Sequence, residues 1–329
     1  MVSFPSVSRE LRALDGVRVA ADAPLAPLTT IGTGGKAKLL VTVADAPAVV
    51  AALKILETCG IPWSCLGAGS DLLVADAGYA GAVIRLDERL QYIEGLPAAP
   101  SGNAQPIIVT VGAATLLAHF AAAAAEAGLA GLEFACAIPG SVGGGVAMNA
   151  GAYGRSLADV LEEAELASAL GTRWSAAGRL KWEYRRCRLP EGVVVTAARF
   201  RLAPDETAAI LARHCSILDK RCAVQPQGVR TFGSTFKNPS GGAAGRLLEA
   251  AGVKGERRGG AEVSSVHANF VVNRGDASTA DVLALMSYMR HRVHETSGVL
   301  LEPEVRLLGG SFPWESSADG PRRPPSADG

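Results

Sequence analysis

Two glycine-rich segments most constrain what this chain can fold into. Gly67-Ala68-Gly69-Ser70-Asp71 stands between apolar stretches, and residues 138–145 (I-P-G-S-V-G-G-G) continue to further glycines at 151 and 154. The first pattern predicts a tight loop between two strands, and the second is too rich in glycine for a helix interior and too long for a hairpin turn. Such loops leave backbone N–H groups free for an anion and suit a pyrophosphate. Ordinary turns are the alternative for each segment alone.

The spacing of these glycines excludes two common phosphate-binding fingerprints. Neither segment fits G-x-x-x-x-G-K-S/T or G-x-G-x-x-G, so neither a P-loop nucleotidase nor a Rossmann dehydrogenase is supported. The chain has 32 Lys and Arg residues against 32 Asp and Glu residues. This balance gives no overall field that would gather nucleic acid or an anionic membrane, so an anionic ligand must be held locally.

Composition and the N-terminal sequence predict a globular cytoplasmic protein. With 329 residues, 48% of them hydrophobic and 19% charged, the chain is long enough for two or three domains and too apolar to be disordered. The longest apolar stretch, 116–125, is too short to span a bilayer, and residues 1–18 lack the continuous apolar segment of a signal peptide. The six cysteines form no C-x-x-C or Cys/His cluster, so we expect reduced thiols and no metal site.

Helix and strand signals along the chain predict an α+β fold. A helix is expected from Asp45 as N-cap to Gly60, and another from Ser278, with Asp281 completing a capping box, to Gly298. Further helices are predicted over 114–127 and 203–219, and strands over 61–66, 72–74, 82–86, 107–111, 163–169, 193–202 and 300–308. The pattern changes near residue 215, where we place a domain boundary. From Ser311 onward the composition predicts a disordered tail.

Seven sequence blocks carry a resemblance to a known family. The run I-P-G-S-V-G-G-G-V-A-M-N-A-G-A-Y-G over 138–154 resembles the signature of the UDP-N-acetylenolpyruvoylglucosamine reductase family. T-T-I-G-T-G-G (29–35) and G-A-G-S-D-L-L-V (67–74) resemble its early flavin-binding blocks. Its catalytic and substrate blocks are resembled by W-E-Y-R-R-C (182–187), G-S-T-F-K-N-P (233–239), H-A-N-F-V-V-N (267–273) and L-E-P-E-V-R (301–306). The blocks stand in the family's order.

The resemblance implies a fold and an activity. The fold would be an FAD-binding region of two α+β subdomains, 1–86 and 87–214, of the vanillyl-alcohol-oxidase (PCMH) type, then a C-terminal α+β substrate-binding domain, 215–310, and a tail, 311–329. The activity would be NADPH-dependent, FAD-mediated reduction of the enolpyruvyl ether of a UDP-sugar to UDP-N-acetylmuramate, for peptidoglycan synthesis and thus cell shape and division. The partners implied are this UDP-sugar and NADPH, with no nucleic acid, membrane insertion or obligate protein partner.

The resemblance also assigns catalytic and substrate-binding residues. Arg185 would hold the substrate carboxylate and stabilise the enolate, Ser234 would protonate the carbanion, and Glu304 would cooperate with Arg185. The expected substrate contacts are Tyr184, Asn238 and His267. Without the family blocks, Arg185 is equally typical of a solvated basic run, Ser234 of a turn, and Glu304 of the solvent face of an edge strand. The short stretch from Arg185 to Ser234 matches the subtype that lacks a tyrosine-loop insertion.

Most of the expected flavin contacts lie in the two glycine segments. They are Gly67, Gly69, Ser70, Asp71, Leu72, Pro139, Gly140, Ser141, Gly143, Gly144, Asn149, Gly151 and, from the last block, Arg306. Asp71 stands where the family usually has Asn, and a carboxylate near a pyrophosphate should weaken flavin binding unless it caps backbone N–H groups. Cys187 and Phe232 replace residues that are commonly Ser and a small residue, without removing a catalytic group. For His267 a structural role is as well supported as substrate contact.

Two other functions stay open on the sequence alone. A different FAD-linked oxidoreductase of the same fold, acting on an alcohol, would have its flavin reduced by the substrate and not by NADPH. A non-catalytic flavin-binding homologue would fold without turnover. The presence of Arg185, Ser234 and Glu304 together argues against this second alternative.

Overall fold

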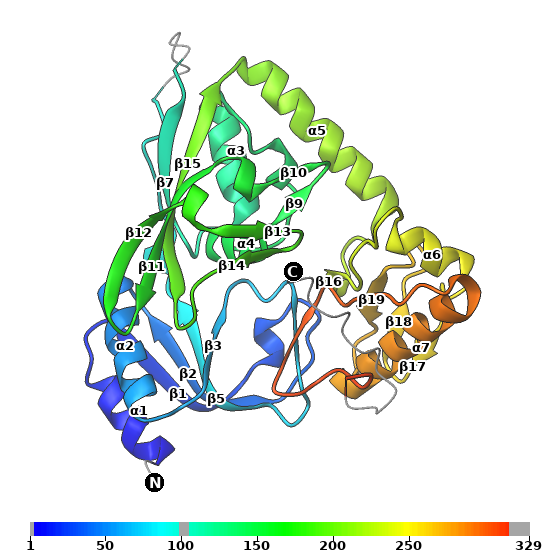
Figure 1. Ribbon diagram of the computed structural model, residues 1–329, viewed down its shortest axis with the longest axis horizontal. Helices are drawn as coiled ribbons and strands as arrows, with labels where there is room; N and C mark the ends of the chain where they lie inside the picture. Colours follow the sequence, from blue (N-terminus) through cyan, green and yellow to red (C-terminus); the bar gives the residue numbers. More distant parts are fainter. Residues whose placement is uncertain (1–2, 99–104, 316–329) are drawn as a thin grey trace, which may run out of the picture.

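The computed structural model describes residues 3–98 and 105–315. Figure 1 shows three lobes in chain order, an N-terminal lobe in blue, a middle lobe in green and a C-terminal lobe in yellow and orange. Each lobe contains a β-sheet and helices, so the predicted α+β class is confirmed. Within the two described ranges, no helix combines the length and the apolar character needed to cross a membrane.

The N-terminal lobe is a four-stranded sheet packed against two helices. The strand order is β1 (Val17–Pro24), β2 (Lys36–Val43), β5 (Tyr79–Leu86) and β3 (Trp63–Leu66), with the first pair antiparallel and the others parallel. The helices are α1 (Phe4–Arg12) and α2 (Ala46–Thr58). The predicted N-cap is confirmed, because the Asp45 carboxylate accepts a hydrogen bond from the Ala48 N–H at 2.8 Å.

The middle lobe is built on an antiparallel sheet. Its strand order is β12 (Gly171–Ala176), β11 (Leu161–Ser168), β15 (Val194–Pro204), β7 (Ile107–Gly112) and β6 (Ile93–Glu94), and β8 (Leu129–Ala130) pairs with the end of β15. Helix α3 (Leu117–Glu126) packs on this sheet, with the rings of Phe120 and Phe200 5.0 Å apart. Residues of α3 and of the sheet therefore share one hydrophobic core, which fixes the position of the loops at their ends.

The second glycine segment forms a helix, and the prediction that it is too rich in glycine for one is wrong. Helix α4 (Val142–Met148) begins at Ser141, whose hydroxyl accepts a hydrogen bond from the Gly144 N–H at 3.3 Å. A Cβ on Gly145 would lie 2.8 Å from Leu117 Cδ1, and one on Gly143 would lie 2.9 Å from Ala113 Cβ. Close packing therefore requires glycine at these two positions, and it outweighs the cost of about 1 kcal/mol per helical glycine.

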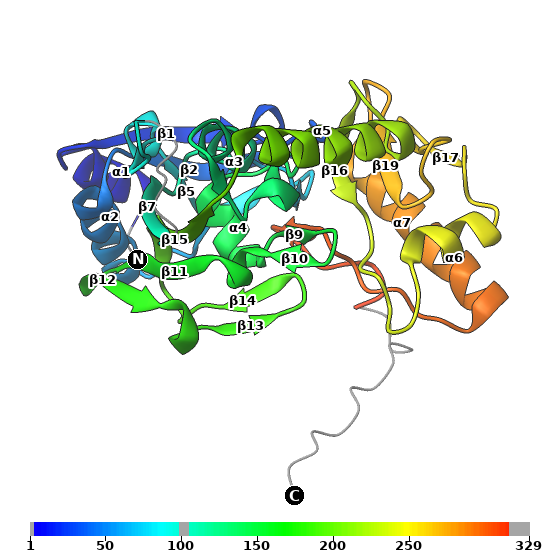
Figure 2. The ribbon, with the colours of Figure 1, turned by 90° about the horizontal axis from the view of Figure 1, so that it is seen from above.

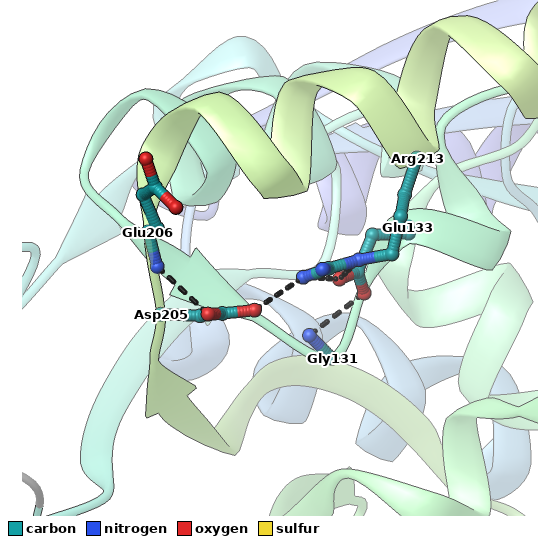
Figure 3. A network of polar contacts seen from close by, with 5 residues as sticks. All are labelled: Gly131, Glu133, Asp205, Glu206 and Arg213. Atoms are coloured by element: carbon teal, nitrogen blue, oxygen red, sulfur yellow. Dashed lines mark hydrogen bonds and ion pairs between the residues drawn. The ribbon is translucent and has the colours of Figure 1, made fainter.

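A long helix joins the middle lobe to the C-terminal lobe. Helix α5 (Thr207–Val224) runs along the edge of the molecule in Figures 1 and 2, and it extends beyond the predicted end at residue 219. Figure 3 shows how its first turns are held: the Arg213 guanidinium lies between the carboxylates of Glu133 and Asp205, at 2.8 and 2.6 Å. Residue 215, where a domain boundary was predicted, lies inside this helix.

The C-terminal lobe has an antiparallel sheet covered by two helices. The strand order is β16 (Arg230–Ser234), β19 (Phe270–Asn273), β18 (Ala261–Val263) and β17 (Arg257–Arg258), and the helices are α6 (Ala244–Ala250) and α7 (Thr279–Ser297). The capping box of Ser278 and Asp281 is confirmed. The carboxylate of Asp76, from the N-terminal lobe, accepts hydrogen bonds from the first two N–H groups of α7 at 2.8 Å each. This contact anchors the C-terminal lobe on the N-terminal one.

The end of the described chain returns to the N-terminal lobe. Strand β20 (Arg306–Leu308) pairs in parallel with β4 (Leu72–Val74). The predicted strand over 300–308 is wrong in its first part, because Pro303 has no N–H to donate and makes only a single bridge with Phe236. The predicted tail is also wrong at its start, because Phe312 is buried and stacks on Trp314. The rest of that predicted tail, 316–329, lies outside the described residues.

Candidate active site

The two glycine segments, remote in sequence, meet in space. The Ser70 hydroxyl donates a hydrogen bond to the Pro139 carbonyl oxygen at 2.6 Å. A Cβ on Gly67 would lie 2.7 Å from the Ser141 hydroxyl oxygen, so the first loop rests directly on the start of α4. Gly69 has a φ of +69°, and its carbonyl accepts a hydrogen bond from the Thr30 N–H at 3.0 Å. Three of the predicted flavin-binding blocks thus form one surface.

This surface fits a pyrophosphate-containing cofactor. A Cβ on Gly144 would meet only the Ser141 hydroxyl, at 3.4 Å, and one on Gly140 only the Ser70 hydroxyl, at 3.5 Å. Packing therefore does not require glycine at 144, and the open backbone at both positions suits close approach of a ligand. A cavity of about 220 Å³ adjoins the first loop and is lined by Pro27, Leu28, Thr29, Thr30, Gly67, Ala68 and Arg85. Arg85, which the sequence analysis missed, adds a cation to this surface.

Three residues predicted to contact the flavin have structural contacts within the protein. Gly143 is required by packing in α4, as described above. Asn149, at a φ of +44°, ends α4, and its amide donates to the Glu183 carbonyl at 3.0 Å and accepts from the Ala158 N–H at 3.2 Å. The carbonyl of Gly151, in β9 (Gly151–Ala152), accepts a hydrogen bond from Arg185 at 2.6 Å. Asn149 and Gly151 therefore position the hairpin that carries Arg185.

Arg185 occupies the turn of that hairpin, between β13 (Lys181–Glu183) and β14 (Arg186–Arg188). Its φ of +59° is unfavourable for a residue with a side chain, and such strain persists where the surrounding structure enforces it. The guanidinium lies 5.0 Å from the centre of the exposed Tyr184 ring. Behind the turn, the Cys187 thiol is buried in the core of the middle lobe, and burial raises its pKa to about 11. This burial explains why a weakly polar thiol is tolerated there.

Arg185 forms an ion pair with Glu304 across two lobes. Arg185 Nε lies 2.6 Å from Glu304 Oε1, with the side chains 23% and 16% exposed. Among the described residues, this buried Nε has no partner that meets hydrogen-bond geometry. Because Nε faces Glu304, a second anion such as a substrate carboxylate would be bound by the other N–H groups of the guanidinium.

Ser234 is brought to the same place by backbone pairing. The Glu304 N–H donates to the Thr235 carbonyl at 2.9 Å, and the Lys237 N–H donates to the Glu302 carbonyl at 2.9 Å. Ser234 ends β16 directly before this pairing, next to Gly233 with a φ of +83°. The three predicted catalytic residues thus come from the middle lobe and from two segments of the C-terminal lobe that run side by side.

Two carboxyl groups at this site bind protons more tightly than usual. Burial raises the pKa of Glu304, and the Arg185 and Lys237 cations reduce this effect. Burial, and then the charge of Glu304, raise the pKa of Asp71 to about 8, against the opposing effects of Arg306, Arg185 and Lys237. In the described part of the chain no N–H group donates to the Asp71 carboxyl, so the alternative that it caps backbone N–H groups is not what the structure shows. Asp71 and Leu72 instead adjoin Arg306, which pairs with Leu72 across β4 and β20.

Two predicted substrate contacts have structural partners. The Asn238 side-chain oxygen accepts a hydrogen bond from the Ala244 N–H at 3.0 Å, at the start of α6. His267 Nδ1 accepts from the Asn269 N–H at 3.1 Å, and its ring packs edge-on against Phe270 at 4.9 Å. Burial lowers the pKa of His267. These contacts favour the structural alternative for His267 and fix one end of each side chain.

The sequence analysis missed two cations at the site. Lys237 lies in the G-S-T-F-K-N-P block and acts on both carboxyl groups, and the block itself was a signal that could have identified it. Arg221, on α5, is half-buried, and burial lowers its pKa, as does the nearby Arg185. No local pattern distinguishes Arg221 from the other charges of α5. In the ranges 3–98 and 105–315 we find no group of three or more His, Cys, Asp or Glu side chains that could hold a metal ion.

Comparisons with known proteins agree with this arrangement. Residues 225–308 match the family model described as UDP-N-acetylenolpyruvoylglucosamine reductase, C-terminal domain, and residues 37–176 match that of an FAD binding domain. The chain is 46% identical over 297 residues to the UDP-N-acetylenolpyruvoylglucosamine reductase of Anaeromyxobacter dehalogenans (strain 2CP-C), covering 90% of this chain and 87% of the relative. It is 44% identical over 313 residues to that of Acidiphilium cryptum (strain JF-5), covering 94% and 98%. The crystal structure of the Thermus caldophilus reductase superposes with a TM-score of 0.74 at 36% identity, covering 89% of this chain and 98% of that one.

Proposed function

The chain belongs to the UDP-N-acetylenolpyruvoylglucosamine reductase family, and from this premise we propose how its residues carry out the reaction. It is an FAD-dependent oxidoreductase that acts on the enolpyruvyl ether of UDP-N-acetylglucosamine in peptidoglycan synthesis. The observation that supports the assignment of roles is the Arg185–Glu304 ion pair at 2.6 Å, which lies beside Ser234 and the glycine surface. Bound FAD supplies the hydride that reaches the terminal carbon of the enol ether.

Arg185 binds the substrate carboxylate in this proposal. The pair of Nε with Glu304 and the hydrogen bond from Nη1 to Gly151 fix the plane of the guanidinium, and its remaining N–H groups are the donors for the substrate carboxylate. A fixed guanidinium costs little reorganisation when negative charge develops on the substrate carboxylate. Arg306 and Lys237 add positive charge near the carboxyl groups of the site, and the Tyr184 ring lies 5.0 Å from the guanidinium.

Ser234 donates the proton that completes the reaction. A serine hydroxyl is a weak acid, so it can protonate only a strongly basic carbon in a site shielded from water. Its position at the end of β16, next to the segment that pairs with Glu304, puts it beside the carboxylate-binding group. Glu304 keeps Arg185 oriented.

The reductant and the domain limits complete the proposal. NADPH donates the hydride that reduces the cofactor and leaves before the UDP-sugar binds.

The functional parts are residues 1–86 and 87–214, which hold FAD, and residues 215–310, which hold the UDP-sugar. The residues nearest the pyrophosphate are Gly67, Gly69, Ser70, Gly140, Ser141 and Gly144. The protein works in the cytoplasm as the subtype without a tyrosine-loop insertion, and its product serves cell-wall growth, cell shape and division.

The overall proposal is tested by following flavin absorbance of purified protein under anaerobic conditions. NADPH alone should bleach the flavin, and the enolpyruvyl sugar nucleotide should then restore the absorbance stoichiometrically. If NADPH does not bleach the flavin, but a chemical reductant does and the sugar nucleotide then restores the absorbance, the choice of NADPH as reductant is wrong. Bleaching that an alcohol achieves, in place of NADPH, would support the other FAD-linked oxidoreductase, and a bound flavin that neither reagent changes would support a non-catalytic protein.

The role of Ser234 is tested by Ser234→Ala. Flavin reduction by NADPH should stay within about twofold of the wild type, and the step driven by the sugar nucleotide should slow by about 10²- to 10⁴-fold, the range for loss of a positioned acid. Ser297→Ala is the matched control, because that hydroxyl donates to the Val293 carbonyl inside α7 and should have no effect on either step. An unchanged second step in Ser234→Ala would remove Ser234 from the mechanism.

A further inference from the structure

Asp71 occupies the junction between the glycine surface and the catalytic carboxylate. It is the last residue of the first glycine segment and directly precedes β4. Its carbonyl oxygen accepts a hydrogen bond from the Arg306 N–H at 3.2 Å, where β20 begins beside β4. Glu304 lies two residues before Arg306 and contacts Arg185. A carboxyl group at this point belongs to the same charged cluster as the catalytic ion pair.

The charges of this cluster can be counted. The charges of three cations act on Asp71, namely Arg185, Lys237 and Arg306, and Glu304 is the other carboxyl group that does so. Glu302, which pairs with Lys237 at 3.5 Å, is 76% exposed, and solvent screens its charge. With both carboxyl groups ionised, a bound substrate carboxylate would bring the cluster to three cations and three anions. With a proton on Asp71, one positive charge remains for the additional negative charge that develops on the substrate during reduction. A second ionised carboxylate would also repel the incoming substrate directly.

We propose that Asp71 is a positioning residue of the substrate site, and that it is present as a neutral, protonated carboxyl group whenever the substrate carboxylate is bound beside Arg185. This inference rests on the proposed function, because it takes the Arg185–Glu304 pair as the carboxylate-binding group. The half-buried position and the absence of any N–H donor to this carboxyl group among the described residues both disfavour its charged form. The resulting pKa of about 8 keeps the proton in place at neutral pH.

The consequence is a substrate affinity that falls on the alkaline side. Below pH 8 most molecules carry the proton on Asp71 and bind, whereas above it the proton is lost and must be taken up again on binding. If only the protonated form binds, linkage makes the dissociation constant rise about tenfold between pH 7 and pH 9. Asn at position 71 is neutral at every pH, so Asp71→Asn should remove this dependence.

The test is a binding titration, without turnover, of the FAD-loaded protein. The enolpyruvyl sugar nucleotide is added to oxidised wild type, Asp71→Asn and Asp22→Asn, and the change in the flavin spectrum gives the dissociation constant from pH 6.5 to 9.5. Asp22 is the matched control, because it is an exposed carboxylate of β1 that pairs only with Lys38 among the described residues. Wild type and Asp22→Asn should weaken about tenfold between pH 7 and 9, and Asp71→Asn should change by less than about twofold.

The same alkaline weakening in Asp71→Asn would overturn the inference while leaving the proposed function intact. No spectral response in any of the three proteins would mean that the proposed substrate is wrong, and the inference would fail with it. If Asp71→Asn does not retain FAD, infrared spectroscopy of the wild type supplies the measurement. A protonated carboxyl C=O band at pH 7 that disappears by pH 9.5 and is retained in Glu304→Gln supports the inference, and its absence from Glu304→Gln at pH 7 contradicts it, because Glu304 also has a raised pKa.

Discussion

Two arginine clusters, each with one Glu and one Asp, behave in opposite ways. Arg213, which holds α5, contacts the carboxylates of Glu133 and Asp205 and forms the network in Figure 3. Each of those carboxylates also accepts a backbone hydrogen bond at 2.8 Å, Glu133 from the Gly131 N–H and Asp205 from the Glu206 N–H. Burial alone would raise the pKa of Glu133, but these donors and Arg213 lower it below the usual value.

In the cluster around Arg185, the carboxyl groups of Glu304 and Asp71 accept no comparable backbone hydrogen bonds among the described residues. Burial raises the pKa of Glu304 and of Asp71, and three nearby cations only reduce the effect. The difference therefore arises from hydrogen bonding and burial and not from residue type. A carboxylate with its donors satisfied stabilises the fold, whereas groups with unmet interactions at a surface that fits a ligand mark a functional site.

The largest expected effect comes from exchanging each arginine for lysine. Arg185→Lys keeps the charge but loses the planar group that contacts both Glu304 and the Gly151 carbonyl, so turnover should fall by about 10²- to 10³-fold. Arg213→Lys should lower the melting temperature and leave turnover within about twofold. Steady-state kinetics and thermal unfolding of both variants check this. Equal turnover in the two variants would show that the Arg185 cluster is structural as well.

Neighbouring glycines in α4 sharpen the same contrast. Gly145→Ala places a Cβ 2.8 Å from both Leu117 Cδ1 and Leu157 Cδ1, and this overpacking should cost about 1–3 kcal/mol of unfolding free energy. Gly144→Ala meets no such obstacle and should stabilise the FAD-free protein by about 0.5–1 kcal/mol.

Cofactor binding distinguishes the two glycine variants further. Gly144→Ala should weaken FAD binding by about tenfold or more, because its methyl group occupies the surface where the pyrophosphate approaches the backbone. Denaturant unfolding without FAD and fluorescence titration with FAD measure the two quantities. FAD affinity equal to that of the wild type in Gly144→Ala would mean that the pyrophosphate does not lie over α4.

Local chemistry accounts for the parts of the fold that the sequence predicted well. The caps of α2 and α7 were correct because Asp45, and Ser278 with Asp281, make their hydrogen bonds within one turn of the helix they begin. Helix α4 was missed because the reason for its glycines is contact with Leu117 and Leu157, which lie in other elements. The first half of the last predicted strand failed at Pro303, although Leu301 and Val305 on either side of it are buried.

The candidate site could be predicted only through resemblance. Arg185 and Glu304 lie in separate lobes, and nothing in the residues near either one indicates the 2.6 Å contact between them. Asn149 and Gly151 were identified as important, but their contacts are with the hairpin of Arg185, because α4 ends beside that hairpin. Arg221 becomes recognisable only when the folded chain brings it near Arg185, whereas Lys237 lies in the G-S-T-F-K-N-P block and could have been identified there.

The smallest expected effect is on the pH dependence of stability in Glu133→Gln and Glu304→Gln. It compares the Arg213 and Arg185 clusters most directly, because each variant removes one carboxyl group. Because the folded-state pKa of Glu133 is lowered, its stabilisation is fully present above the usual Glu pKa of about 4.3 and is lost as pH falls through the lower folded value. Glu133→Gln should therefore be less stable than wild type at pH 7, by about 1 kcal/mol. This difference should shrink toward pH 3.

Glu304→Gln should show the opposite sign. A carboxyl group whose folded pKa is raised costs stability once pH exceeds its unfolded pKa, so replacing it with a neutral amide should leave the melting temperature at pH 7 unchanged or higher. Any gain should vanish as pH falls and the wild-type carboxyl group takes up its proton. Melting temperatures of wild type and both variants from pH 3 to 8 supply the data. A loss of stability in both variants at pH 7 would mean that Arg185 holds Glu304 as Arg213 holds Glu133, and the raised proton affinity at the site would then need another cause.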